Sequence, residues 1–176
     1  MNEFRLLKYI HIVFALSISH ISAEENNMFF YGTLTNEPCT LAPEDQTVDV
    51  DFESIVNKDL YLNARTAGRP FTLHLQNCSV QDKPKVSVTF TGNESSLFPG
   101  LLLPAGGVER GVMIGIESDN GKLVMINKSW PIGELVEGEN NLSFKAYLVA
   151  TPEAKVSRSI ALGPLTASVT FEFSYD

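Results

Sequence analysis

The chain has 176 residues, 44% of them hydrophobic, and its 13 Lys and Arg face 21 Asp and Glu, which gives a formal net charge of -8 at pH 7. This acidic balance, with no cluster of Lys and Arg, disfavours nucleic acid as a partner, because nothing in the chain would release the counterions of the phosphates. The cysteines and histidines are too few for a metal site, so we expect neither a metal nor a cofactor.

Residues 1–23 have the features of a secretory signal peptide. Arg5 and Lys8 precede an apolar run over residues 9–18, and the small pair Ser22 and Ala23 follows, after which we predict cleavage. The apolar run is too short to cross a bilayer, and no later stretch approaches the roughly 20 apolar residues of a membrane helix. We therefore expect an exported, soluble chain with no membrane span, whose length suits one domain.

Alternation of apolar and polar residues predicts many short strands along the mature chain. The apolar positions of these strands, in chain order, are Met28, Phe30 and Leu34 around Gly32; Val48, Val50 and Phe52; Phe71, Leu73 and Leu75; Val86, Val88 and Phe90; Val112, Ile114 and Ile116; Leu142, Phe144, Ala146 and Leu148; and Ala167, Val169, Phe171, Phe173 and Tyr175. Only "DFESIVNKDLYL" could form a short helix. The turn "DNG" at residues 119–121 predicts a hairpin. Such a pattern favours an antiparallel sandwich or barrel.

Cys39 and Cys78 are the only cysteines. In an exported chain, such a pair most simply forms one disulfide. Closing a loop of that length would stabilise the fold by about 4 kcal/mol in the chain-entropy model. The apolar loop "SLFPGLLLPAGG", residues 96–107, is expected to lie against an edge of the sandwich.

Few residues are candidates for catalysis. His74 is the only histidine after the predicted cleavage site, and it lies on the polar face of a predicted strand with no nucleophile turn in the sequence. Asp49 and Asp51 alternate with valines, so both should face solvent rather than form an acid pair. Trp130 and Tyr147 could line a sugar site, but single aromatic residues in strands more often belong to the core.

The two ends of the predicted mature chain both carry strongly alternating strands. The last strand, with Phe171, Phe173 and Tyr175 on one face, is rich in aromatic residues, although terminal residues often fray. From the residues alone, the simplest interpretation is that the two terminal strands pair with each other inside one ordinary sandwich. The alternative is that each strand engages a partner outside the chain.

Several segments, in this order and spacing, resemble the pilin subunits of chaperone-usher fimbriae, close to the minor subunits of type-1-like fimbriae. They are "MFFYGTLTNEPCTL", "FTLHLQNC" followed by "VSVTFTG", "GVMIGIESDNGKLV" and "GPLTASVTFEFSYD". The resemblance covers residues 24–176. It implies an all-β, immunoglobulin-like sandwich that lacks its last strand, so that residues 24–35 form a donor-strand extension and residues 36–176 the pilin domain.

The resemblance also implies partners and a role for particular residues. A periplasmic chaperone would lend a strand to the groove, and at the outer-membrane usher the extension of a neighbouring subunit would replace it. The residues of the extension that would fill the next groove are Met28, Phe30 and Leu34, with Gly32 where no side chain fits. The residues of the terminal strand that the chaperone would engage are Ala167, Val169, Phe171, Phe173 and Tyr175. The matching disulfide is Cys39–Cys78.

One position departs from the family pattern: in the register that Gly32 fixes, the outermost inward residue is Asn26, which is polar. The favoured hypothesis is a non-enzymatic structural subunit of a surface fimbria that supports cell adhesion, of minor or adaptor type. The alternatives are a lectin-like tip subunit, against which the extension argues, and a secreted carbohydrate-active enzyme, against which the lack of an acid pair or metal cluster argues.

Overall fold

The structure is a computed structural model that describes residue 31, residues 38–81 and residues 85–175. The elements below belong to a compact unit that spans Asn36–Asp176. The predicted signal peptide and the predicted donor residues of the extension lie outside the described residues, so both stay predictions. Among the helices that are described, none has the length and apolar character needed to span a bilayer.

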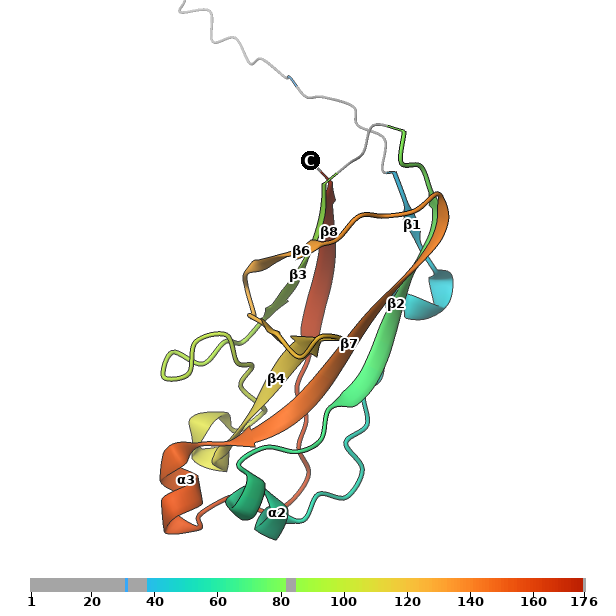
Figure 1. The fold of residues 1–176 in the computed structure, drawn as a ribbon. Helices are drawn as coiled ribbons and strands as arrows, with labels where there is room; N and C mark the ends of the chain where they lie inside the picture. The colour runs from blue at the N-terminus through green and yellow to red at the C-terminus, as the bar shows by residue number, and fades with distance from the viewer. Residues whose placement is uncertain (1–30, 32–37, 82–84, 176) are drawn as a thin grey trace, which may run out of the picture. The chain divides into compact units, whose positions relative to one another are not determined.

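Two antiparallel sheets form an open sandwich, as predicted (Figure 1). The first sheet has five strands in the order β1-β2-β7-β4-β5. Their bounds are β1 Thr40–Leu41, β2 Arg69–Cys78, β7 Gly138–Ala150, β4 Val112–Ser118 and β5 Leu123–Val124. The second sheet has three strands in the order β6-β3-β8. Their bounds are β6 Ser129–Ile132, β3 Val86–Gly92 and β8 Val169–Tyr175. The predicted hairpin at residues 119–121 joins β4 to β5.

The predicted apolar positions meet between the two sheets. Phe71 of β2 and Phe144 of β7 stack with ring centroids 5.6 Å apart, and Phe90 of β3 meets both rings edge-on. Aromatic pairs in these geometries contribute beyond their buried area. Leu73 and Val88 are fully buried beside them. Because these alternating side chains are buried between the sheets, each of these strands has one face toward the core.

Two expectations about strands were wrong in detail. The segment 48–52 alternates as predicted, with Val48 and Phe52 against the core and Asp49 and Asp51 exposed, but it pairs with no strand among the described residues. It is extended chain without a ladder. β8 begins at Val169, so Ala167 lies before the strand and is exposed instead of facing inward.

Short helices occupy one end of the sandwich. The predicted helical turn is α2, Asn57–Asn63, which buries Leu60. The second helix, α3, Pro152–Ser157, was not predicted; the Thr151 hydroxyl caps it by accepting from the Ala154 N–H, and Pro152 opens it. Figure 1 shows both helices at the end opposite the C-terminus of β8. Single 3-10 turns lie at η1, Pro43–Gln46, and η2, Gly107–Arg110.

The opposite end is closed by the predicted disulfide. Cys39 is bonded to Cys78 at the end of β2, and both are buried with Leu75, against which Leu135 packs. The bond joins the chain near the start of the described domain to the last residue of β2. Entry of the chain into the fold is therefore covalently fixed at this end.

One long edge of the sandwich is sealed by the loop at residues 96–107. Leu102, which is 3% exposed, exchanges backbone hydrogen bonds of 2.8 and 3.0 Å with Ile114 of β4. Asn127 connects the sheets: its N–H donates to the Phe90 carbonyl, and its side-chain amide exchanges two hydrogen bonds with the Gly92 backbone. The predicted position of this loop against a sandwich edge is confirmed. We call the segments around Leu102 and Asn127 the closed edge.

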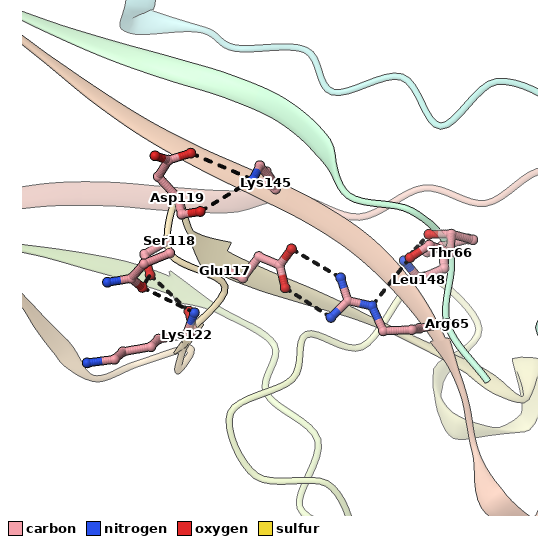
Figure 2. A network of polar contacts seen from close by, with 9 residues as sticks. Arg65, Thr66, Glu117, Ser118, Asp119, Lys122, Lys145 and Leu148 are labelled. Carbon is pink, nitrogen blue, oxygen red and sulfur yellow. Dashed lines mark hydrogen bonds and ion pairs between the residues drawn. The ribbon is translucent and has the colours of Figure 1, made fainter. Parts of the chain in front are cut away.

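The outer face of β4 is also covered. Gly115 lies under the ring of Tyr147, and a Cβ at this position would come within 2.3 Å of that ring. The Arg65 guanidinium lies 3.7 Å from the centroid of the same ring. Figure 2 shows Arg65 reaching Glu117 of β4 through two hydrogen bonds of 2.9 and 3.1 Å. Tyr147 is thus buried, but on the outside of the sheet and not in the core between the sheets.

Candidate functional site

The long edge opposite the closed edge is formed by β8. Among the described strands, β8 pairs with β3 on one side only, in the register Val88 to Phe173 and Phe90 to Phe171. Val88 and Phe90 are at most 1% exposed, whereas their neighbours Phe171 and Phe173 on the same face are only partly buried. The additional exposure therefore arises on the side of β8 away from β3. A further strand at that position would cover it.

Residues 50–53, which include the end of the segment 48–52, line one cleft together with residues 160–165, which precede β8. Val48 and Phe52 pack against the same core cluster as Phe171 and Phe173. Its alternating pattern without a ladder is what a strand shows when its partner is not present, because buried strand faces require pairing of the backbone groups beside them. We call β8 together with residues 48–52 the open edge.

A cleft of about 270 Å³ lies at the end of the open edge where the chain enters β8. Its apolar lining comes from both sides of that edge: Val50, Phe52, Ile55, Leu60, Ile160 and Leu165. Polar and charged residues also line the cleft, among them Asp51, Glu53 and Arg110.

Arg110 holds one wall of this cleft. Its Nη2 donates to the Pro164 carbonyl at 2.7 Å and to the Gly163 carbonyl at 3.4 Å. The Arg110 carbonyl also accepts from the Ala161 N–H at 3.1 Å. A planar guanidinium can contact several acceptors at once, so this side chain fixes the segment that precedes β8. The opposite wall is fixed by an ion pair of 2.8 Å between Arg69 and Glu53.

The polar groups outside this edge have structural partners. Asp45, which is buried, accepts from the backbone N–H of His74 and contacts the His74 Nδ1 at 2.9 Å. His74 is therefore not fully solvent-facing as predicted, but is partly buried and paired with Asp45. Glu117 is paired with Arg65, and this hydrogen bond raises the pKa of the Arg65 guanidinium. Within the described residues no group of His, Cys, Asp and Glu could hold a metal ion.

Two further pKa shifts accompany these contacts. Burial raises the pKa of the Tyr147 hydroxyl above its usual value. Hydrogen bonds from the Gly100 N–H and the Asn127 side chain lower the pKa of Glu94. At neutral pH the Tyr147 hydroxyl therefore stays protonated and the Glu94 carboxyl stays ionised.

Four of the predicted terminal-strand residues lie together on the inward side of β8: Val169, Phe171, Phe173 and Tyr175. The cleft and the role of Arg110 were missed. Arg110 is 53 residues from Gly163, and no local pattern indicates that pairing. The sequence does carry one signal, because Gly163 and Pro164 mark a break in regular structure immediately before the last strand.

Solved structures share this fold. The P pilus rod subunit PapA superimposes with a TM-score of 0.69 at 21% identity, covering 80% of this chain and all of that chain. A structure of a chaperone-usher pilus superimposes with the same TM-score at 20% identity, covering 90% of this chain and 99% of that chain. At these identities the likeness shows the fold.

Sequence relatives are closer. The uncharacterised fimbrial-like protein YfcP of Escherichia coli K12 is 34% identical over 93% of this chain and 90% of its own length. The fimbrial adapter PapK of Escherichia coli is 33% identical over 90% of this chain and 93% of its own. The major MR/P fimbria protein of Proteus mirabilis is 27% identical over 83% of this chain and 81% of its own.

The family model described as fimbrial protein matches residues 28–176. This match includes the open edge, the closed edge and the disulfide. The open sandwich, its single disulfide and the relatives agree with the resemblance drawn from the sequence. The chain belongs to the fimbrial protein family and is a structural subunit of a fimbria.

Proposed function

We propose that the open edge is an acceptor site for one donated strand, and that the chain polymerises by donating its own extension, residues 24–35, to the same site of a neighbouring subunit. The observation that carries this proposal is the partly buried inward face of β8, together with the segment 48–52, which packs against the same core and pairs with no described strand. Strand addition satisfies the backbone groups of such an edge and covers its apolar side chains. No catalytic step is needed, and we propose a non-enzymatic role.

The energy of strand addition is sufficient to lock a neighbour in place. Three large apolar side chains of the extension, Met28, Phe30 and Leu34, would each contribute roughly 1.5–3 kcal/mol on burial, or about 5–9 kcal/mol in all. Each new ladder hydrogen bond adds around 1 kcal/mol. Gly32 would lie where the donated strand approaches the acceptor most closely, since glycine carries no side chain.

An open apolar edge also predicts a transient partner before assembly. Exposed, unpaired strand edges template aggregation, so a free subunit requires a protein that covers the edge. We propose that a periplasmic fimbrial chaperone does so by pairing with β8 along Val169, Phe171, Phe173 and Tyr175. An outer-membrane usher would then exchange the chaperone strand for the extension of a neighbour. The chain would thus reach the cell surface through the periplasm and support cell adhesion there.

We propose a minor or adaptor position in the fibre. The relative with an adapter name is 33% identical to this chain, and the major fimbria protein reported above is 27% identical. The predicted extension is compatible with every position that has a subunit ahead to accept it. A tip position has no such subunit, which makes the lectin-like alternative less favourable.

The test of this proposal is periplasmic expression with and without the cognate chaperone, followed by size-exclusion chromatography. We expect a one-to-one complex with the chaperone, and aggregation or loss of the chain without it. Replacing residues 24–35 by a Gly-Ser segment of equal length should preserve the chaperone complex and abolish transfer to the subunit ahead. A stable monomer obtained without chaperone would contradict the proposal.

A further inference from the structure

Several large apolar side chains are exposed at the end of the sandwich that carries α2 and α3. Leu62 of α2 is 68% exposed and Val156 of α3 is 88% exposed. Leu62 and Val156 follow the buried residues of their helices by two positions, so they lie on the outer sides of both helices. The exposed apolar residues of this end, together called the apolar end, are Val56, Leu62, Val108, Val156 and Leu162.

The segments of the apolar end are bonded to one another. The Tyr61 hydroxyl of α2 accepts from the Ile160 N–H at 3.1 Å. The Thr151 N–H, at the start of α3, donates to the Gly111 carbonyl at 2.9 Å, immediately after η2. α2 and α3 also contact each other (Figure 1). The exposed side chains are therefore held on one fixed surface and not on independent loops.

The geometry of strand donation brings a second molecule to this surface. Every strand pair of the fold is antiparallel, and antiparallel pairing is the more stable arrangement. A strand added antiparallel to β8 runs toward the start of β8. The segment that precedes β8, residues 160–165, lines the cleft together with Asn57 and Leu60 of α2. The donated strand therefore ends beside the apolar end.

The linker between the extension and the body of the donor is short. Only Asn36, Glu37 and Pro38 separate Thr35 from Cys39, the first residue of the fixed fold. A fully extended chain crosses this interval in roughly 13–14 Å. Because this linker is short, the folded domain of the donor must lie close to the point at which its donated strand leaves the groove.

From this geometry we propose that the apolar end is a docking surface for the body of the donating fimbrial subunit. The donor contacts this surface with the end of its own domain that carries its first disulfide cysteine. This inference rests on the proposed function, because it requires the donated strand. Charged residues of both signs surround the surface, among them Lys58, Asp59, Glu153 and Arg158. Net charge would thus contribute little, and the contact would depend on burial of the apolar side chains.

The test places a photo-crosslinking amino acid at single positions of the full chain, in bacteria that assemble the fimbria. The two test positions are Leu62 and Val156. Leu97, on the closed edge, is the matched control, since it is also a leucine and also 68% exposed. Purified fimbriae are irradiated, and the crosslinked peptides are identified by mass spectrometry. A further variant at Phe171 reports separately on the groove.

We expect Leu62 and Val156 to crosslink several-fold more than Leu97, to the body of a fimbrial subunit near its first cysteine, while Phe171 crosslinks to an extension. If Phe171 crosslinks to an extension but Leu62 and Val156 do not exceed Leu97, the docking surface is refuted and the proposed function stands. If Phe171 reaches no extension, both are refuted. Crosslinks from Leu62 only to proteins other than fimbrial subunits would also refute the docking surface.

A substitution tests the same surface without a probe. Leu62→Asp with Val156→Asp introduces charge at two exposed positions, so the chaperone complex should form in normal yield. We expect fimbriae that contain this variant to dissociate in warm detergent at a lower temperature than fimbriae with Leu97→Asp. Equal dissociation temperatures would contradict the docking surface.

Discussion

The two long edges of this sandwich meet the same physical requirement in different ways. At the closed edge, Leu102 and Asn127 supply from within the chain the hydrogen bonds and apolar cover that the ends of two sheets need. At the open edge, Phe171 and Phe173 stay partly exposed, and residues 48–52, which pack against the same core, form no ladder with any described strand. The difference shows that the open edge is specific to one side of the fold and does not result from a generally loose sandwich.

The largest expected effect comes from matched truncations at the two edges. Leu102→Ala should lower the free energy of unfolding by about 2–5 kcal/mol, because it leaves a cavity at a fully buried site. Phe171→Ala should cost less in the free subunit, since its side chain is only partly buried. Because the free domain is expected to aggregate, residues 36–176 would be refolded by dilution from urea at a protein concentration low enough to prevent association. Urea unfolding would be compared with that of the same domain with residues 24–35 appended through a flexible linker after Asp176.

With the appended strand, the cost of Phe171→Ala should rise, whereas the cost of Leu102→Ala should not change. This follows because the donated strand covers the open edge only. An equal cost of Phe171→Ala in both proteins would mean that the strand does not reach this side chain, and the comparison between the edges would fail.

Asn127→Ala should be the next largest effect, at roughly 1.5–3 kcal/mol, because it leaves the Gly92 N–H and carbonyl without their partner. Asn127 also has a φ of 59°, which alanine adopts less readily than asparagine. Asn127→Gly separates the two causes, since glycine removes the side chain without the backbone strain. If Asn127→Gly is as stable as the natural protein in thermal unfolding, the hydrogen bonds at the closed edge contribute little.

Arg110→Met should have a smaller effect, about 1–2 kcal/mol, because a flexible apolar side chain replaces the donor to the Gly163 and Pro164 carbonyls, which water can then reach. We expect hydrogen exchange to increase in residues 160–166, at the start of the open edge, and to stay unchanged around Leu102. Exchange that increases equally at both edges would show that Arg110 stabilises the whole fold and not this segment.

The smallest effect concerns pH and the closed edge. The pKa of Glu94 is lowered from 4.5 in the fold, so the carboxylate contributes stability above that pH and loses it as the pH falls through the folded-state pKa. Glu94→Gln should therefore flatten the fall in the urea midpoint between neutral and acidic pH. Glu139→Gln, at an exposed glutamate elsewhere, is the control. Identical pH profiles for Glu94→Gln and the natural protein would contradict the assignment.

Much of this fold can be predicted from alternation in the sequence, because most strands bury one face. β2, β3, β4 and β7 fall where the apolar positions predicted them. Residues 48–52 show the limit of that reasoning. Their alternation correctly predicts which side chains face the core. A hydrogen-bonded ladder also needs a partner strand, and the described residues supply none. Alternation alone therefore cannot separate a paired strand from an unpaired one.

The contacts that complete the structure could not be predicted, because they join residues far apart in the sequence. Arg65 and Glu117 are 52 residues apart, and nothing local indicates that they pair or that Tyr147 lies beneath Arg65. α3 had a recognisable start in Thr151 and Pro152. With only 6 residues, however, it is too short to show a helical period. The proposed donor residues and the chaperone contacts stay predictions.

The Cys39–Cys78 disulfide has a mechanical consequence for a fibre built in the proposed way. Tension along such a fibre enters each subunit through its extension and therefore arrives at Cys39. The covalent bond passes this load directly to Cys78, at the end of β2, which pairs along most of its length with β7. A pull on the extension thus shears the longest strand pair of the domain and cannot unravel the fold from its first residue.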